Sequence, residues 1–107
     1  WDVSNVEDFS DVFRQKYYFD EDINAWNVSK ATTMEGMFGH ACRFNRNLSC
    51  WNVSNVTNMS QMFWENTKFK GDISTWDTSN VCDMSLMFYC CTRFNGDISH
   101  WNVSNVT

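Results

Sequence analysis

Few side chains in this sequence have the chemistry of catalysis, and their spacing does not group them. The chain contains two histidines, His40 and His100, and neither lies at the spacing from a cysteine pair that a zinc site requires. It contains no glycine-rich phosphate loop, no His-Glu-x-x-His motif and no nucleophile elbow. We therefore predict that the protein is not an enzyme, has no metal site and binds no cofactor.

The five cysteines form no recognisable disulfide pattern. They are Cys42, Cys50, Cys82, Cys90 and Cys91, and their odd number leaves at least one thiol unpaired in a monomer. We interpret them as small buried residues. The alternatives are a bridge between the adjacent Cys90 and Cys91, or a disulfide to another chain.

Asparagine and aspartate recur throughout the sequence and indicate two kinds of chemistry. Stacked side-chain oxygens are ligands that calcium accepts, but Asn and Asp in turns more often bind backbone N–H groups, and we favour that second role. Several asparagines also begin Asn-x-Ser/Thr, which predicts N-glycosylation at exposed corners in a eukaryotic secretory pathway. The sequon asparagines are Asn27, Asn47, Asn52, Asn55, Asn58, Asn102 and Asn105.

All these residues are carried by a repeat of fixed length. Trp1, Trp26, Trp51, Trp76 and Trp101 are spaced by 25 residues, and the segments between them align without insertion or deletion. We number the repeat positions from 1 to 25, beginning at each tryptophan. The chain is thus a single domain, 1–107, with units 1–25, 26–50, 51–75 and 76–100 and a partial fifth unit, 101–107.

Each unit keeps large apolar residues at the same positions, so it has an apolar stripe that it cannot bury alone. Stacking of neighbouring units must supply the core. The spacing of Ile23, Trp26 and Val28 predicts a short strand with one buried face, and the recurring Met-Ser-x-Met-Phe segment predicts a helical turn. The expected fold is therefore α/β, with a short parallel sheet and one short helix or 3₁₀ turn in each repeat.

The consensus Trp-(Asp/Asn)-Val-Ser-Asn-Val-Thr-(Asn/Asp)-Met-Ser-x-Met-Phe closely resembles a bacterial surface protein repeat, the Mycoplasma lipoprotein-like repeat. The resemblance covers essentially the whole chain. The order of the apolar residues also resembles a variant of the leucine-rich repeat. These resemblances imply a right-handed solenoid of leucine-rich-repeat type and an extracellular or cell-surface protein.

The aromatic residues fall into two groups. The tryptophan that begins each unit alternates with polar residues, which is typical of a core position rather than of an outward-facing sugar platform. Trp64, Tyr17, Tyr18 and Tyr89 differ between repeats, and these four are our candidates for exposed contacts with a partner.

Charge and composition limit the partners. The net charge of −5 disfavours nucleic acid, and no apolar run reaches the roughly 20 residues that a membrane-spanning helix needs, so we expect no membrane insertion. The expected function is an extracellular structural or adhesive module that contacts other proteins or copies of itself. The alternatives are a subunit of a self-assembling fibre and a carbohydrate-binding module for surface glycans.

Both ends of the sequence carry the ordinary repeat motif, from Trp1 to Val6 and from Trp101 to Val106. We therefore expect either a segment of a longer array or a unit that stacks on copies of itself.

Overall fold

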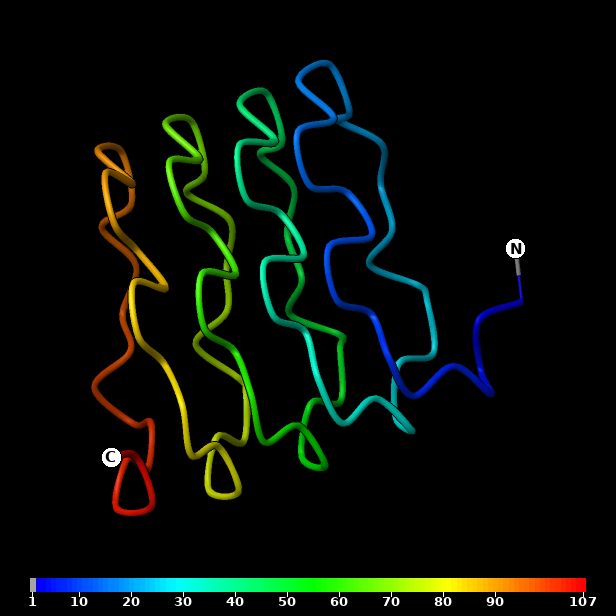
Figure 1. The fold of residues 1–107 in the computed structure, drawn as a ribbon, viewed down its shortest axis with the longest axis vertical. Helices are drawn as coiled ribbons and strands as arrows, with labels where there is room; N and C mark the ends of the chain where they lie inside the picture. Colours follow the sequence, from blue (N-terminus) through cyan, green and yellow to red (C-terminus); the bar gives the residue numbers. More distant parts are fainter. Residues whose placement is uncertain (1) are drawn as a thin grey trace.

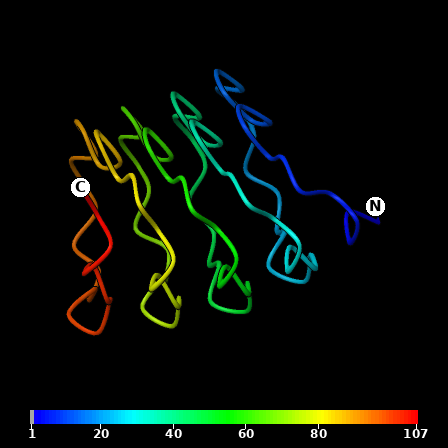
Figure 2. The same ribbon diagram turned by 60° about the horizontal axis from the view of Figure 1, so that its bottom comes forward.

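The computed structural model describes residues 2–107. The chain runs through coils that lie side by side in sequence order, with the two termini at opposite ends of the stack (Figures 1 and 2). We call residues 2–25 coil 1, 26–50 coil 2, 51–75 coil 3 and 76–100 coil 4. Residues 101–107 begin a further turn beside coil 4. The whole measures 32 × 30 × 19 Å along its principal axes.

Residues 2–107 contain no helix and no strand. Isolated parallel bridges join the coils at one repeat position, from Asp8 to Thr33, from Thr33 to Asn58 and from Asn58 to Asp83. The prediction of a right-handed, leucine-rich-repeat-like α/β solenoid, with a parallel sheet and a helix or 3₁₀ turn in each repeat, is therefore wrong. The 25-residue period is nevertheless present in the structure, because each bridge joins residues 25 positions apart.

The segment predicted to be helical divides its N–H groups between two kinds of acceptor: some donate three residues back within the segment, as from Met37 to Met34, and the alternate ones donate to the next coil. In coil 2, every second N–H group from Met34 to His40 donates to a carbonyl of coil 3, at 2.8 to 2.9 Å. Coils 1 and 3 repeat this pattern with the coils that follow them. An α-helix needs the same N–H groups for carbonyls four residues earlier in its own segment. The bonds between coils therefore exclude the helix.

Left-handed backbone at two repeat positions gives this segment its shape. The residues at positions 11 and 15 have φ between 53° and 63° in every coil. They are Asp11, Gln15, Gly36, His40, Gln61, Glu65, Leu86 and Cys90. Gly36 adopts this conformation without a side-chain penalty, and a Cβ there would displace the exposed carboxylate of Asp11. The other residues pay about 1 to 2 kcal/mol each for this conformation, which the bonds between coils must offset.

The predicted strand is replaced by turns. In coil 3 the Oδ1 atom of Asn52 accepts the backbone N–H of Ser54 at 3.0 Å and its hydroxyl at 2.7 Å. This Asx turn bends the chain just after Trp51, where a strand would run straight. Side chains then join the coils in place of a backbone ladder: Asn55 Nδ2 donates to the carbonyl of Ser29 at 2.9 Å.

Two phenylalanine columns form the centre of the core. Rings of Phe13, Phe38, Phe63 and Phe88 stack between neighbouring coils with centroids 5.5 to 5.9 Å apart. Rings of the second column, Phe19, Phe44, Phe69 and Phe94, lie 5.7 to 6.1 Å apart. Within each coil the two rings stack at 4.0 to 4.6 Å. The repeat thus places like rings on like rings.

The tryptophan column lies inside the molecule from Trp51 to Trp101, as predicted, whereas Trp26 is half-buried. Trp51 and Trp76 are each 3% exposed and Trp101 is 9% exposed. Their indoles stack at 6.4 and 6.1 Å, and each Nε1 donates to a carbonyl of the preceding coil, as from Trp76 to Leu48 at 3.0 Å. Trp1 lies outside the described residues. The column is a core element that also bonds one coil to the next.

Trp76→Phe should lower the free energy of unfolding by about 1 to 3 kcal/mol, because it removes the buried indole hydrogen bond to the Leu48 carbonyl, which then keeps only the Trp51 N–H at 3.1 Å, and leaves part of the indole volume empty. Trp64→Phe is the matched control, since Trp64 is half-buried and its Nε1 donates no hydrogen bond in the described chain. The control should lose less than about 1 kcal/mol. Urea unfolding followed by circular dichroism measures both, and equal losses would contradict the role given to the indole N–H.

Candidate functional site

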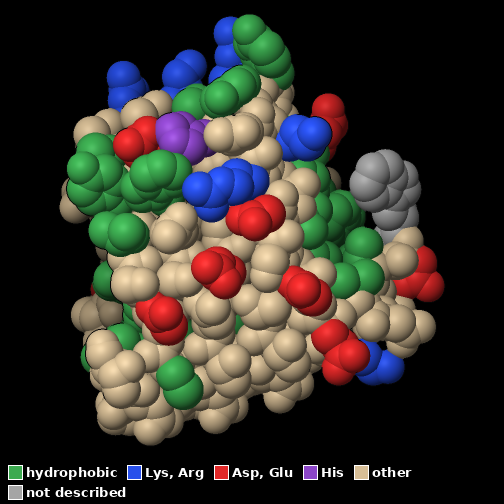
Figure 3. Space-filling model, viewed as in Figure 1, with side chains coloured by type: hydrophobic (Ala, Val, Ile, Leu, Met, Phe, Trp, Pro, Cys, Tyr) green, Lys and Arg blue, Asp and Glu red, His purple; other side chains and the backbone are tan. Residues whose placement is uncertain are grey.

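Large exposed hydrophobic side chains of the described chain lie only at the two ends of the stack. They are Val6, Val12, Tyr17, Tyr18, Leu86, Tyr89 and Val103. All of them belong to coil 1, to coil 4 or to residues 101–107, and coils 2 and 3 contribute none. Figure 3 shows hydrophobic side chains on both flanks of the molecule, with a largely polar surface between them.

Equivalent repeat positions show why these side chains are exposed. Val12 is 41% exposed, whereas Met37 and Met62 at the same position of coils 2 and 3 are fully buried. Val103 is 53% exposed, whereas Val53 is 1% exposed. Val12 and Val103 thus lack the neighbouring coil that covers their equivalents, whereas position 18, which Tyr18 holds, is exposed in every coil.

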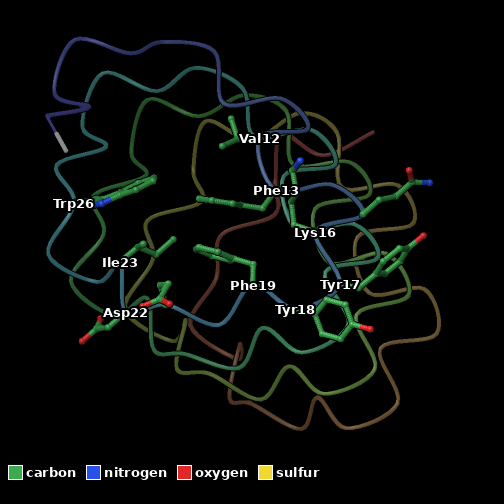
Figure 4. A pocket seen from close by; sticks show the side chains of 11 residues that line it. Val12, Phe13, Lys16, Tyr17, Tyr18, Phe19, Asp22, Ile23 and Trp26 are labelled. Atoms are coloured by element: carbon green, nitrogen blue, oxygen red, sulfur yellow. The ribbon is translucent and has the colours of Figure 1, made fainter.

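The outer face of coil 1, which we call the N-face, is hollowed. A cavity of about 820 Å³ opens there. The side chains of Phe13, Phe19, Ile23 and Trp26 point into it, and Tyr17 and Tyr18 lie to one side (Figure 4). Inside the stack, the equivalent surface is where one coil packs on the next.

The outer face at the other end, which we call the C-face, has a smaller cavity of about 600 Å³. Met84, Met87, Phe88, Ile98 and Trp101 line it, with Tyr89 and Val103 among the other lining residues. Both end faces are therefore apolar and concave.

The two faces differ in their backbone chemistry. On the C-face, every second N–H group from Met84 to Cys90 makes no hydrogen bond within the described chain, although the equivalent groups of coils 1 to 3 all donate to the next coil. On the N-face, every second carbonyl from Asp8 to Arg14 is likewise without a donor, although the equivalent carbonyls of coils 2 to 4 accept one. One face thus presents hydrogen-bond donors and the other presents acceptors, in the same register.

Trp64 lies on the side of the stack and is half-buried rather than exposed. The Arg14 guanidinium lies 5.3 Å from its ring centroid, the His40 ring packs edge-on at 4.6 Å, and the Tyr89 ring lies at 6.5 Å. His40 also faces Glu65, with Nε2 and Oε2 3.2 Å apart. This cluster was not predicted from the sequence. Its signal is the shared repeat position 14 of Arg14, Trp64 and Tyr89.

The four residues predicted to contact a partner are not brought together in one site. Tyr17 and Tyr18 border the N-face cavity, and Tyr89 borders the C-face cavity. Tyr18 is 78% exposed and carries the Arg43 guanidinium at 4.9 Å from its ring centroid. A partner contact at any of the four stays a prediction.

The sequon asparagines lie at the surface but differ at the nitrogen that a glycan would occupy. The Nδ2 atoms of Asn55, Asn58 and Asn105 each donate a hydrogen bond. Within the described chain, the side chains of the other four bond only through Oδ1, and these are Asn27, Asn47, Asn52 and Asn102. Glycosylation itself stays a prediction, and these four are the more accessible acceptors.

The aspartates of the repeat close turns in the same way as the asparagines. The hydroxyl and backbone N–H of the serine two residues later hold the pKa of each carboxyl below its usual value of 3.8, and for Asp83 the backbone N–H is the larger cause. The six are Asp2, Asp8, Asp72, Asp77, Asp83 and Asp97. Among residues 2–107, no three His, Cys, Asp or Glu side chains gather closely enough to hold a metal ion.

All five cysteines are free thiols in the structure. Cys91 is buried, its Sγ donates to the carbonyl of Asn66 at 3.2 Å, and burial raises the pKa of its thiol to about 11. Cys42 is half-buried, and Cys50, Cys82 and Cys90 are exposed. The interpretation as buried residues is therefore correct for Cys91 and wrong for the three exposed cysteines.

The aspartate turns predict loss of stability in acid. Because the folded-state pKa values are lowered, the stabilisation is complete above the unfolded value near 3.8 and is lost as the pH falls through the folded values. Asp77→Asn should make the unfolding free energy less dependent on pH below 4, since Asn52 and Asn102 form the same turn without a titrating group. Asp77→Ala should lower stability at pH 7 as well. Urea unfolding between pH 2.5 and 7 checks this, and an unchanged profile for Asp77→Asn would contradict it.

Comparison with known proteins gives one match. A family model described as "Mycoplasma protein of unknown function, DUF285" matches residues 1–74 and again residues 47–107, which together span the chain. No curated protein and no solved structure matches. The family agrees with the predicted Mycoplasma repeat, whereas the leucine-rich-repeat detail of that prediction is not supported. Within residues 2–107 no helix has the length and apolar character needed to cross a bilayer.

Proposed function

We propose that this chain, which belongs to the Mycoplasma family of unknown function DUF285, is an extracellular structural repeat module that extends by head-to-tail stacking. In this proposal the C-face receives the N-face of a further coil of the same kind. The observation that carries it is the complementarity of the two faces, one with unpaired N–H groups and the other with unpaired carbonyls in the same register.

Stacking would remove both unfavourable features of the end faces, namely the unpaired backbone groups and the exposed apolar side chains. The unpaired N–H groups between Met84 and Cys90 would donate to carbonyls placed like those between Asp8 and Arg14. The exposed apolar side chains would be covered, as Met37 and Met62 are covered inside the stack. Apolar burial contributes about 25 cal/mol per Å², and buried N–H groups are rarely left unpaired in proteins.

Residues 101–107 define where a further coil would begin. They already occupy the first seven positions of the turn beside coil 4, and the Thr107 N–H donates to the Cys82 carbonyl at 3.1 Å. The unpaired N–H groups lie at positions 9 to 15, beyond this segment. An incoming coil would therefore dock from position 8 onward, and the first seven residues of an incoming copy would be displaced.

The proposed contact has a direction. Two C-faces would place donors against donors, and two N-faces would place carbonyls against carbonyls. Only unlike faces fit, which makes the interface heterologous and lets the stack continue without closing. This geometry suits either a long array within one chain or a fibre of separate copies. The extracellular location is part of the proposal and is supported by the resemblance of the repeat to bacterial surface proteins.

Charged variants of the exposed valines test the proposal. Val12→Asp blocks the N-face and Val103→Asp blocks the C-face, and both positions are exposed in the isolated chain, so folding should persist. The unaltered polypeptide should associate as its concentration rises. Each variant alone should stay monomeric, with association weakened at least about tenfold by an unpaired buried charge. An equimolar mixture of the two variants should form dimers and nothing larger, because each contributes one open face. Sedimentation velocity measures all four samples.

Thr67→Asp is the matched control, because Thr67 is exposed on the side of coil 3, away from both end faces. It should associate like the unaltered chain. If the Val12→Asp variant dimerised in the absence of the other variant, like faces would be pairing, and this would contradict the head-to-tail arrangement. A polypeptide that remains monomeric at millimolar concentration would equally rule out stacking of separate copies.

A further inference from the structure

Three exposed cations stand in line along one edge of the stack. Arg43, Lys68 and Arg93 occupy repeat position 18 in coils 2, 3 and 4, and all three are exposed. Figure 3 shows Lys and Arg side chains projecting along the upper edge of the molecule, where the tight loops of the coils lie in Figure 1. We call these three residues the cationic row.

The cationic row has no acidic partner within the described chain. None of its members forms an ion pair, whereas Arg14 and Arg46 do. Arg43 instead lies over the ring of Tyr18, which holds position 18 in coil 1. The tyrosine therefore continues the line of the cationic row.

This arrangement is exceptional in the repeat. No other position carries three charges of the same sign in consecutive coils. At position 22, which is the most acidic, Asn47 separates Asp22 from Asp72 and Asp97.

Neighbouring hydrogen-bonded segments lie about 4.8 Å apart, so the three cations of the row repel one another across a short distance. A chain of net charge −5 nevertheless concentrates three of its eight cations in this row. An anionic ligand would relieve the repulsion.

We propose that the cationic row binds a linear acidic polysaccharide laid along the edge of the stack. A single file of charges at a regular spacing fits a polymer with one anionic group on each successive unit. The neighbouring side chains suit a sugar: Thr67 and Thr92 place exposed hydroxyls beside the row, and the 78% exposed ring of Tyr18 offers a stacking surface at its end.

Two other polyanions fit less well. An anionic membrane is broad, and the acidic remainder of the protein would be repelled by a surface wider than the row. Single-stranded nucleic acid binds best where aromatic rings alternate with cations along a groove, whereas here Tyr18 is the one aromatic side chain at position 18. The inference does not depend on head-to-tail stacking, since the row lies on the side of the coils.

Binding of heparin and of polygalacturonate, measured by isothermal titration calorimetry between 20 and 200 mM salt, tests the proposal. Lys68→Gln removes the central charge of the row. It should weaken binding of both polymers and should reduce the slope of log affinity against log salt by about 1. Lys30→Gln is the matched control, with the same charge change in coil 2 but with Lys30 bonded to Asn5 at repeat position 5. The affinity of this control for both polymers should stay within about twofold of that of the unaltered chain, because Lys30 is separated from the cationic row and salt screens its charge.

Further samples separate the competing explanations. Dextran, which is neutral, should not bind. Val12→Asp should bind heparin as well as the unaltered chain, so failure of stacking and failure of polysaccharide binding are distinguishable. Equal losses for Lys68→Gln and Lys30→Gln would mean that total charge alone matters, and no binding to either acidic polymer at 20 mM salt would overturn the proposal. Tighter, Lys68-dependent binding to vesicles with 30% anionic lipid, or to single-stranded DNA, would assign the row to that ligand instead.

Discussion

The structure depends on one set of hydrogen bonds, in which alternate N–H groups between repeat positions 9 and 15 donate to the carbonyls of the next coil. These bonds fix the register between coils, so that a residue lies beside the residue 25 positions later. They also require left-handed backbone at positions 11 and 15, which seven non-glycine residues adopt. The turns in this segment are therefore held by bonds to a neighbouring coil, and in coil 4 these are the bonds that its carbonyls accept from coil 3.

The fixed register between coils brings the equivalent apolar residues of the repeats into contact, and these contacts form the core. Phe38 stacks between Phe13 and Phe63, and Trp76 stacks between Trp51 and Trp101, because each ring meets its own equivalent. The polar residues obey the same register. Asn or Asp at position 2 closes a turn in each coil, so the corners stay aligned while the phenylalanine columns pack behind them.

The same register explains the character of the surfaces. A stack that donates in one direction and accepts in the other must end in two unlike faces, and each end also exposes apolar side chains that have no coil to cover them. The sides of the stack bring equivalent positions into rows. A row of like charges, such as Arg43, Lys68 and Arg93, is therefore a direct consequence of stacking and is not visible as a patch in any one coil.

The sequence by itself determined the period, the apolar columns and the inward position of the tryptophans, because these follow from residue type repeated at a fixed spacing. It also indicated that Asn and Asp bind backbone N–H groups in turns.

The sequence did not determine the secondary structure. Met59 to Phe63 has the composition of a helical turn, yet its alternate N–H groups find their acceptors in coil 4, about 25 residues away, which local propensity cannot report. The packing of one coil on the next also decided which side chains are exposed. Val12 and Met37 hold the same repeat position, yet only Met37 has a coil on both sides. Trp64 is half-buried among Arg14, His40 and Tyr89, which come from three other coils.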